Sequence, residues 1–171
     1  MFELATSVDI IAPHEVQAVA VPIMRQYVPT ILLPPHITLM FPFVPFDQLD
    51  TACETLRQLA VEIAPFEVTL AGYGEFPGVI YMQPVEPAPI KHVFYQLYDA
   101  FPDYPPYEGA FGNDLQPHMT VVQLDDDTVS ADLSLPDYDP ITFQVDKLHV
   151  WYGVRHQDLP WLTYEVLPLG R

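Results

Sequence analysis

Apolar residues recur along this chain with two different periods. After Pro13, and again after Asp47, they return every three or four positions, which indicates the buried face of a helix. Other apolar stretches are short, rich in β-branched and aromatic residues, and bounded by glycine or proline, which is typical of strands. Asp47 is also placed to cap the second helix. The elements we predict are strands at residues 4–11, 36–43, 66–73, 79–85, 118–124, 141–152 and 161–167, and helices after Pro13, after Asp47 and at residues 88–101.

This order of elements predicts an α+β fold with mainly antiparallel sheets. The consecutive strands at residues 66–73 and 79–85, and at residues 141–152 and 161–167, are joined by polar or glycine-containing segments and favour antiparallel pairing. A weak internal repeat accompanies the pattern, because each half of the chain contains a helix and a later strand that opens with Pro-His-apolar-Thr-apolar. The two copies of this repeat read PHITL and PHMTV.

The composition indicates a folded chain without disulfides. Of the 171 residues, 50% are hydrophobic, which is enough to bury a core, and we expect residues 1–171 to form a single domain. The 20 prolines cluster where predicted elements join, and do not form one biased tract. Cys53 has no second cysteine to pair with, no basic segment precedes the first apolar stretch, and no apolar run reaches the roughly 18 residues of a membrane span. We therefore expect a cytoplasmic protein with no membrane partner.

The chain is strongly acidic. It has 6 Lys and Arg against 23 Asp and Glu, which gives a formal net charge of −17. A field of this sign repels polyanions, so the charge argues against long nucleic acid as a partner. One phosphate can still be held locally by hydroxyls, imidazoles and backbone N–H groups. The expected partner is a small phosphodiester or nucleotide, and we expect the protein to be a monomer.

The candidate chemistry lies in the repeat, which contains His36-Ile37-Thr38 and His118-Met119-Thr120. In a strand, residues i and i+2 point to the same face, so each histidine shares a face with its threonine while the apolar residue between them enters the core. If an approximate two-fold axis relates the two halves, both faces can meet across one cleft. In-line displacement at phosphorus needs a base, an acid and donors for the non-bridging oxygens, which two imidazoles and two hydroxyls supply without a metal. The alternative for either copy alone is a structural histidine in the core.

At these residues the chain resembles the 2H phosphoesterase superfamily, in particular its 2′-5′ RNA ligase-like branch, over nearly its whole length. PPHITLMFPF is similar to the first family motif and QPHMTVV to the second. FPGVIYMQPVEPAPIKHVFYQLYDAF is similar to the central strand and helix of the family, and KLHVWYGVRHQDLPWLTYEVLPL to its closing hairpin. The resemblance implies a bilobal α+β fold of two mainly antiparallel sheets with flanking helices, related by a pseudo-two-fold axis, with the site in the groove between the lobes.

The resemblance also implies an activity. It predicts hydrolysis, or reversible formation, of 2′,3′-cyclic phosphodiesters, 2′-5′ linkages or a related small cyclic phosphate, with neither metal nor cofactor. By position, His36 and His118 would be the acid/base pair, and Thr38 and Thr120 would bind phosphate. Analogy with the family favours His118 as the base for water and His36 as the acid on the leaving hydroxyl.

The cationic residues of the family pattern are missing here. Family members often carry Arg or Lys after the two motif strands and before the central strand, where this chain has Met40, Gln123 and Gly78. Their absence argues against long RNA substrates and against ligation, and it favours a nucleotide-sized or non-nucleic phosphodiester. It also motivates an alternative, in which the protein binds a nucleotide or a partner without turnover.

Five further side chains are candidates for lining the groove. His149 shares one face of a late strand with Trp151, so both can face the site. Tyr73, Phe76 and Tyr81 lie near the central hairpin, where they can stack on a base. Aromatic residues make up 13% of the chain and commonly serve core packing, which is the alternative for these three residues.

The remaining polar candidates favour the surface. The three aspartates at residues 125–127 would be the acidic element of a metal-dependent hydrolase, but no spaced ligand pattern follows them, so a solvated turn is the preferred interpretation. Arg155 and His156 fall in the last predicted turn, where a phosphate contact is the alternative to a solvated loop. His14 and His92 are predicted on the exposed faces of helices.

Overall fold

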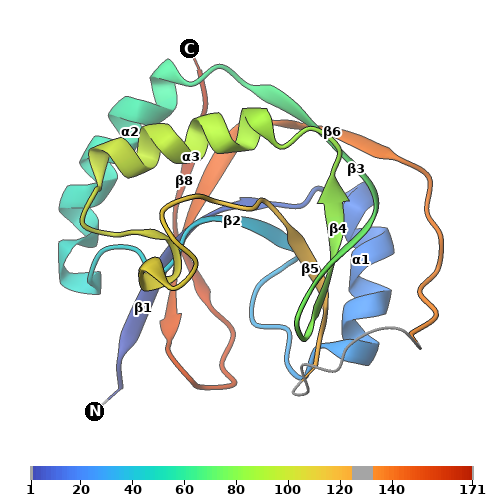
Figure 1. Ribbon diagram of the computed structural model, residues 1–171. Helices are drawn as coiled ribbons and strands as arrows, with labels where there is room; N and C mark the ends of the chain where they lie inside the picture. The colour runs from blue at the N-terminus through green and yellow to red at the C-terminus, as the bar shows by residue number, and fades with distance from the viewer. Residues whose placement is uncertain (1, 125–132, 171) are drawn as a thin grey trace.

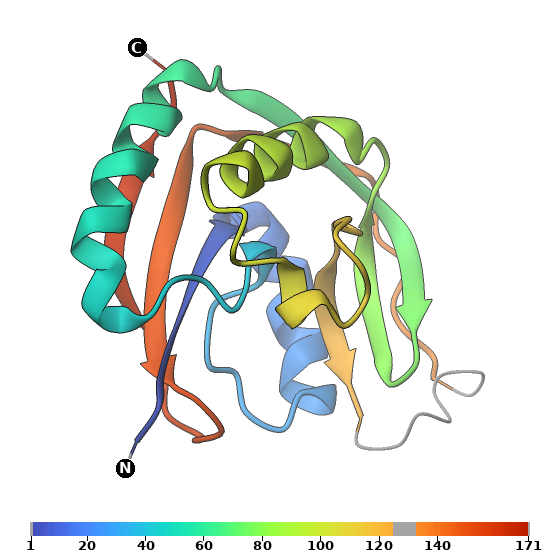
Figure 2. The same cartoon turned by 60° about the vertical axis from the view of Figure 1, so that its left-hand side comes forward.

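The computed structural model describes residues 2–124 and 133–170, which form two four-stranded sheets with flanking helices (Figure 1, Figure 2). The strands are β1 (Leu4–Ile11), β2 (His36–Met40), β3 (Phe66–Phe76), β4 (Val79–Pro84), β5 (Met119–Gln123), β6 (Ile141–Val145), β7 (Lys147–Val154) and β8 (Leu162–Pro168). The helices are α1 (His14–Tyr27), α2 (Leu49–Glu62) and α3 (Ala88–Ala100), with 3₁₀ turns η1 (Phe46–Gln48) and η2 (Pro106–Gly109). The first sheet has the order β2-β1-β7-β8 and the second β5-β4-β3-β6, with antiparallel pairing in both. The predicted α+β class is confirmed.

The two halves of the fold repeat one unit. In the first sheet β1 leads through α1 to its neighbour β2, and in the second sheet β4 leads through α3 to its neighbour β5. Each helix packs across onto the other half, since α1 contacts β5 and α3 contacts β2. This exchange matches the expected pseudo-two-fold relation. It also brings the two motif strands, β2 and β5, into contact near the centre of the molecule (Figure 1).

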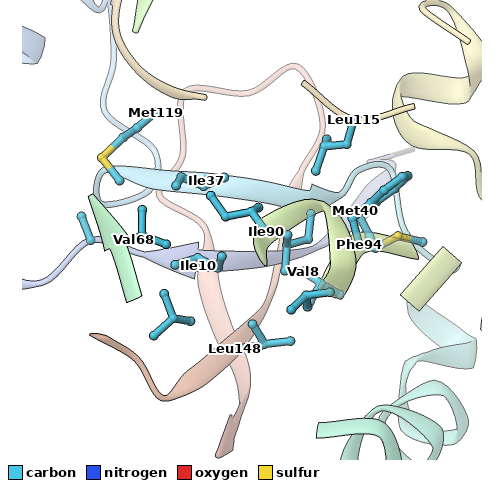
Figure 3. Close-up of a cluster of buried hydrophobic side chains, with 14 of the residues drawn as sticks. Val8, Ile10, Ile37, Met40, Val68, Ile90, Phe94, Leu115, Met119 and Leu148 are labelled. Atoms are coloured by element: carbon cyan, nitrogen blue, oxygen red, sulfur yellow. The ribbon is translucent and has the colours of Figure 1, made fainter. Parts of the chain in front are cut away.

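Packing in the hydrophobic core determines the direction in which the motif side chains point. Ile37 of β2 and Met119 of β5 are fully buried, together with Ile90 and Phe94 of α3 (Figure 3). Because side chains alternate along a strand, burial of the central residue of each His-x-Thr motif turns the flanking histidine and threonine to the opposite face. The apolar residue at position x therefore serves as the anchor of each motif.

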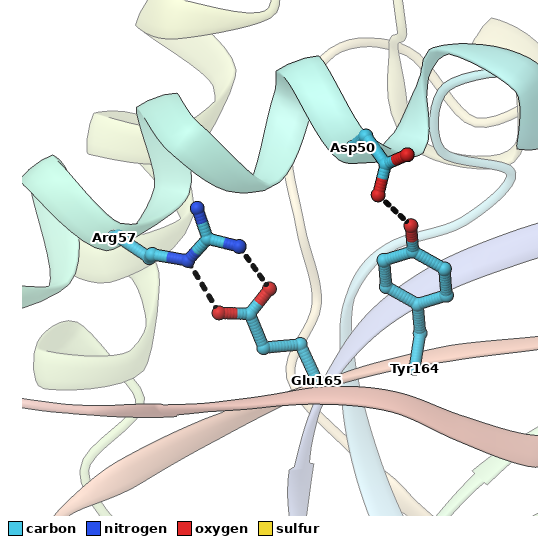
Figure 4. A network of polar contacts seen from close by, with 4 residues as sticks. All are labelled: Asp50, Arg57, Tyr164 and Glu165. Atoms are coloured by element: carbon cyan, nitrogen blue, oxygen red, sulfur yellow. Dashed lines mark hydrogen bonds and ion pairs between the residues drawn. The ribbon is translucent and has the colours of Figure 1, made fainter.

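Helix α2 is tied to the edge strand β8 by a polar network (Figure 4). The Nε and Nη2 atoms of Arg57 donate to the two carboxylate oxygens of Glu165 at 2.5 and 2.9 Å, and the hydroxyl of Tyr164 donates to Asp50. These contacts hold α2 at one edge of the first sheet. The motif strand β2 lies at the opposite edge, where it faces β5.

Two predictions about local structure are wrong. The strand predicted at residues 141–152 is two strands, with β6 in the second sheet and β7 in the first. Buried residues are two positions apart up to Val145, and the next buried residue, Leu148, is three positions further on. The chain changes sheets at this irregularity. Asp47 does not cap α2. It lies within η1, and Gln48 precedes the helix without a side-chain capping hydrogen bond.

The boundaries of the motif strands also differ from the prediction. Strand β2 ends at Met40, whereas the prediction continued to residue 43. Strand β5 begins at Met119, so His118 directly precedes the strand that it was predicted to open. Both histidines nevertheless stand at the entry to their strands.

Candidate active site

His36 opens β2 at the edge of the first sheet, directly after two prolines. It lies opposite Ile11, where the pairing of β1 with β2 ends. The Nδ1 atom of His36 lies 2.8 Å from the carbonyl oxygen of Pro34. A carbonyl oxygen only accepts hydrogen bonds, so Nδ1 carries the proton and donates. In the neutral ring this leaves Nε2 with a free lone pair.

His118 is held in the same way at the start of β5. Its Nδ1 atom lies 2.8 Å from the carbonyl oxygen of Gln116, which again stands two residues earlier. Both motifs therefore fix the same tautomer, and Nε2 is the atom free to take up or release a proton in each ring. Burial lowers the pKa of His118, the hydrogen bond to Gln116 opposes this shift, and repulsion from a charged His36 adds to it. The fold thus brings the two rings within electrostatic reach of each other.

Aromatic side chains pack against the half-buried His118. The rings of Phe76 and Tyr81 lie edge-on to the imidazole, with centroids 5.1 and 5.5 Å away. Tyr81 stands opposite Thr120 in the pairing of β4 with β5, and it folds over Gly74 of β3, where a Cβ atom would lie 2.3 Å from the ring carbon Cζ. Two of the predicted lining residues therefore lie beside a motif histidine. Both rings pack against an imidazole whose burial lowers its pKa.

A buried carboxyl that was not predicted from the sequence lies beside the first motif. Asp9 of β1 is fully buried and faces Thr38 across the pairing of β1 with β2. Its Oδ2 atom accepts a hydrogen bond from Ser7 Oγ at 2.5 Å, while Oδ1 has no hydrogen-bond partner among the described residues. Burial raises the pKa of Asp9, and the charge of His36 and the hydroxyls of Ser7 and Thr38 oppose the rise. The signal available in the sequence was an aspartate inside an apolar strand.

Tyr107 reaches the same place from the loop between α3 and β5. It belongs to η2, and its ring packs edge-on against Phe41, which follows β2, with centroids 6.3 Å apart. Burial and the charge of Asp9 raise the pKa of Tyr107 to about 12, whereas an interaction with the Thr38 hydroxyl lowers it. The Tyr107 hydroxyl therefore lies near Thr38 and Asp9 and is protonated at neutral pH. No pattern in the proline-rich loop pointed to this residue.

The two motifs face different surroundings. A carboxyl and a tyrosine hydroxyl lie near the first motif, and two aromatic rings pack against the histidine of the second. Such a set can move protons at two nitrogens and can bind an anion through hydroxyl groups. Within residues 2–124 and 133–170, no group of three His, Cys, Asp or Glu side chains is arranged to hold a metal ion. The acidic triplet at residues 125–127 lies outside the described residues.

A family model described as the 2′-5′ RNA ligase superfamily matches residues 23–157, which include both His-x-Thr motifs. The chain belongs to the 2′-5′ RNA ligase superfamily. The resemblance to 2H phosphoesterases is thereby confirmed.

Relatives within the superfamily support the assignment over most of the chain. A candidate phosphoesterase of Bacillus pumilus is 33% identical over 147 residues, covering 81% of each chain, and one of Bacillus licheniformis is 30% identical over 147 residues, covering 81% of this chain and 82% of its own. The structure of Escherichia coli LigT complexed with NADP+ has a TM-score of 0.69 and 15% identity and covers 100% of both chains. TT0787 of Thermus thermophilus has a TM-score of 0.70 and 18% identity, covering 98% of this chain and 99% of its own. These two structures show the superfamily fold for this chain.

This superfamily member has no cation at the three positions where the resemblance suggested one. Met40 is buried in the core, Gly78 forms the turn between β3 and β4 with a φ of 78°, and Gln123 is exposed at the end of β5. Four lysines and arginines in the described part of the chain pair with carboxylates, as Arg57–Glu165, Lys91–Asp114, Lys147–Asp146, and Arg155 with Glu3 and Glu108. Arg25 is a fifth cation in the described part of the chain, and it lies exposed in the last turn of α1.

Three predicted lining residues of this superfamily member contact other parts of the fold. Tyr73 donates to the carbonyl oxygen of Pro136 at 2.6 Å, and its ring packs edge-on against Tyr138. His149 stacks on the buried Trp151, with ring centroids 6.4 Å apart, and lines a cavity of about 390 Å³ whose lining includes neither motif histidine. Burial lowers the pKa of His149, and the charge of a nearby lysine adds to the shift.

Three histidines predicted at the surface are exposed, and Arg155 is half-buried. His14 and His92 lie on the exposed faces of α1 and α3, and His156 is exposed in the turn between β7 and β8. Arg155 bridges the carboxylates of Glu3 and Glu108, each at 3.3 Å. Its charge is thus already matched by two acids.

Proposed function

We propose that this protein is a metal-independent phosphoesterase that opens a small cyclic phosphodiester by acid-base catalysis between His36 and His118. The proposed substrate class is a 2′,3′-cyclic nucleotide or a related cyclic or 2′-5′-linked phosphate. The observation that carries the proposal is the paired geometry of the motifs, in which each ring binds a carbonyl two residues earlier through Nδ1 and leaves Nε2 free. Membership of the superfamily and similarity to candidate phosphoesterases support the reaction class.

The surroundings of the two rings favour different roles. Burial lowers the pKa of His118, so its ring is neutral near neutral pH and Nε2 can accept a proton from water. The Asp9 carboxyl lies within electrostatic reach of His36, whose charge opposes the rise that burial causes in the pKa of Asp9. We therefore assign His118 as the base and His36 as the acid.

The proposed step balances protons between the two rings. The oxygen of water forms a bond to phosphorus while one of its protons passes to Nε2 of His118. The bond between phosphorus and the 2′ or 3′ oxygen of the ring breaks, and that oxygen takes the proton from Nε2 of His36. The hydroxyls of Thr38 and Thr120 donate to the non-bridging oxygens, where negative charge is concentrated. The product is a phosphate monoester with one free hydroxyl, and proton exchange with solvent resets both rings.

Charge limits the size of the proposed substrate. A net charge of −17 and a site that relies on neutral donors disfavour long nucleic acid. Structures of Escherichia coli LigT have been solved with NADP+, 3′-AMP and ATP, which are all small nucleotides. We infer a ligand of the same size for this chain, with Phe76 and Tyr81 as candidates for stacking on its base.

Phosphorus NMR of the reaction products tests the proposal. Purified protein in EDTA is given 2′,3′-cyclic nucleotides and ADP-ribose 1″,2″-cyclic phosphate, and is compared with the His36→Ala and His118→Ala variants. We expect ring opening by the wild type and its loss in both variants, with the exposed His92→Ala variant as a control that keeps full activity. Retained activity in either motif variant, or dependence on a metal removed by EDTA, would contradict the mechanism.

Binding of phosphate by uncharged donors would also be compatible with a second candidate function. A site without a lysine or arginine beside the phosphate stabilises the charge that develops in the transition state less well. The protein can therefore be a member of the superfamily that binds a nucleotide without turnover. In that case 3′-AMP binds at the motifs while no cyclic substrate is opened. Calorimetric binding of 3′-AMP that is lost in the Thr38→Ala variant, together with no product in the NMR assay, would favour this candidate.

A further inference from the structure

A cavity of about 390 Å³ lies beside His149, where β6 leads into β7 and α1 begins. Its volume falls within the range of small-molecule pockets. The lining combines apolar side chains with polar ones, and the polar ones include His14 of α1, Asp146, and Lys147 and His149 of β7. The cavity therefore has the size and the polar groups to hold part of a small ligand.

Strand pairing places this cavity beside the motif strand β2. Asp9 of β1 stands opposite Thr38 of β2 on one side and opposite His149 of β7 on the other. Residues directly opposite each other in an antiparallel pair point to the same face, so Thr38 and His149 share one face of the first sheet. Ile11, which lines the cavity, stands opposite His36. Neighbouring strands lie roughly 4.8 Å apart, so a ligand on this face reaches from β2 to β7 over about 10 Å.

The cavity brings positive charge to a face whose motif strands carry none. The ammonium group of Lys147 lies 4.0 Å from the carboxylate of Asp146, whereas Arg57 and Lys91 approach their carboxylates to 2.5 and 2.9 Å. Lys147 and Asp146 are 54% and 64% exposed, and ion pairs between exposed side chains contribute little stabilisation. Lys147 can therefore exchange this contact for one with a ligand of higher negative charge.

His149 supplies a second donor to the same cavity. It lies two residues after Lys147 on β7, so both side chains point to one face, and its ring stacks on Trp151. Burial and the charge of Lys147 lower the pKa of His149, and the charge of Asp146 opposes the shift. The ring is thus neutral near neutral pH and offers one N–H group. An ammonium group and an imidazole N–H together suit the oxygens of a phosphate.

We propose that this cavity is a second phosphate subsite, in which Lys147 and His149 bind a phosphate group of the substrate other than the reacting one. The inference rests on the proposed function, because that function places the reacting phosphate at His36 and Thr38. A nucleoside with a cyclic phosphate on its 2′ and 3′ oxygens and a further phosphate on its 5′ oxygen carries the two groups on opposite sides of one ribose. The substrate class is thereby narrowed to cyclic phosphodiesters that bear a second phosphate.

Calorimetric titration with two product-like nucleotides tests the subsite. Adenosine 3′,5′-bisphosphate and 3′-AMP differ only in the 5′ phosphate, so the ratio of their affinities isolates its contribution. Hydrogen bonds to charged groups correspond to a factor of roughly ten or more, and we expect the wild type to bind the bisphosphate roughly ten-fold more tightly than 3′-AMP. Lys147→Met keeps most of the side-chain stem and removes its charge, so it should abolish most of this preference.

Two further measurements locate the effect. In NMR spectra, the ring signals of His149 should shift when the bisphosphate is added, and shift less when 3′-AMP is added. Arg25→Met is the matched control, because it removes one positive charge from the exposed far end of α1, roughly 16 Å along the helix from the cavity-lining His14. It should leave the preference unchanged, and thermal unfolding checks that both variants remain folded.

Several results would overturn the inference. They are equal or absent binding of the two nucleotides by the wild type, a Lys147→Met variant that keeps the full preference, an equal loss in Arg25→Met, and equal shifts of the His149 signals with both nucleotides.

The binding assay also separates this inference from the proposed function, since it requires no turnover. If the wild type opens no cyclic phosphate while Lys147→Met loses the preference for the bisphosphate, the proposed hydrolysis fails and the second subsite stands. If cyclic phosphates are opened but the two nucleotides bind equally, the hydrolysis stands and the second subsite fails.

Discussion

Replacing Gly74 with alanine should alter the chemistry of His118 through the packing of Tyr81. A Cβ atom at Gly74 would lie 2.3 Å from Cζ and 2.5 Å from both Cε2 and the hydroxyl oxygen of Tyr81, whereas ordinary contacts are 3.4–4 Å. The Tyr81 ring would therefore have to move by roughly 1 Å or more, and overpacking of this kind costs about 1–3 kcal/mol. The backbone is no obstacle, because Gly74 is not among the positive-φ residues of the described chain.

Displacement of the ring should change a measurable pKa. Tyr81 lies 5.5 Å from His118, and burial is the main cause of the lowered pKa of His118. Once the ring moves and water enters, the pKa of His118 should rise toward the ordinary value of 6.5. A smaller fraction of His118 would then be neutral at a given pH. The acid limb of the pH profile of kcat/KM should therefore shift to higher pH.

NMR titration of the histidine rings and thermal unfolding measure the two effects separately. Gly153→Ala is the matched control, since its Cβ atom would lie 2.5 Å from Trp161 in the other half of the fold. It should destabilise the protein by a similar amount and leave the titration of His118 unchanged. A Gly74→Ala protein that loses stability as expected but keeps the wild-type pKa of His118 would show that the packing of Tyr81 does not lower this pKa.

Three further predictions follow from burial. Because burial lowers the pKa of His118, the acid limb of kcat/KM in the wild type should lie below the ordinary histidine value of 6.5, and a limb above this value would count against His118 as the base. Burial raises the pKa of Asp9 above its unfolded value, so the folded state binds more protons and stability should fall as pH rises through the folded-state pKa. Asp9→Asn removes this dependence, so the stability of the variant relative to the wild type, measured by urea unfolding, should grow with pH. A difference in stability that stays constant would exclude the Asp9 carboxyl as the cause of the pH dependence. Phe94 is fully buried, so Phe94→Ala should cost about 3–5 kcal/mol in the same assay, and a loss below about 1 kcal/mol would contradict a tightly packed core.

The motifs and most strands could be predicted from the sequence because their signals are local. Period-two alternation around Ile37 and Met119 places each histidine and threonine on one face, whatever the sheet order. The change of sheet between β6 and β7 was less visible, because an apolar pattern runs through it and only the slip from Val145 to Leu148 marks it. Whether a continuous pattern belongs to one strand or two depends on tertiary pairing, which local periodicity does not encode.

The surroundings of the motifs depend on contacts between distant segments. Asp9 reaches Thr38 through a strand pairing whose register shifts between Val8 and Asp9, and nothing in the sequence marks that bulge. Tyr107 arrives from a loop in which two residues other than glycine, Tyr107 and Glu108, adopt left-handed backbone angles. The sequence likewise placed Tyr73 and Tyr81 near one hairpin but could not separate their roles. Only the folded structure shows that Tyr73 contacts Pro136, whereas Tyr81 contacts His118.

If His118 is the base and His36 the acid, their variants should respond differently to the leaving group of the substrate. The rates of the wild type, His36→Ala and His118→Ala are measured on a 2′,3′-cyclic nucleotide and on a p-nitrophenyl nucleotide phosphodiester, whose leaving group needs no proton. We expect His36→Ala to lose activity on the cyclic substrate but to keep much of its activity on the p-nitrophenyl ester, whereas His118→Ala should lose both activities. Equal losses by His36→Ala on the two substrates, or sparing of the p-nitrophenyl ester by His118→Ala instead, would contradict the assignment.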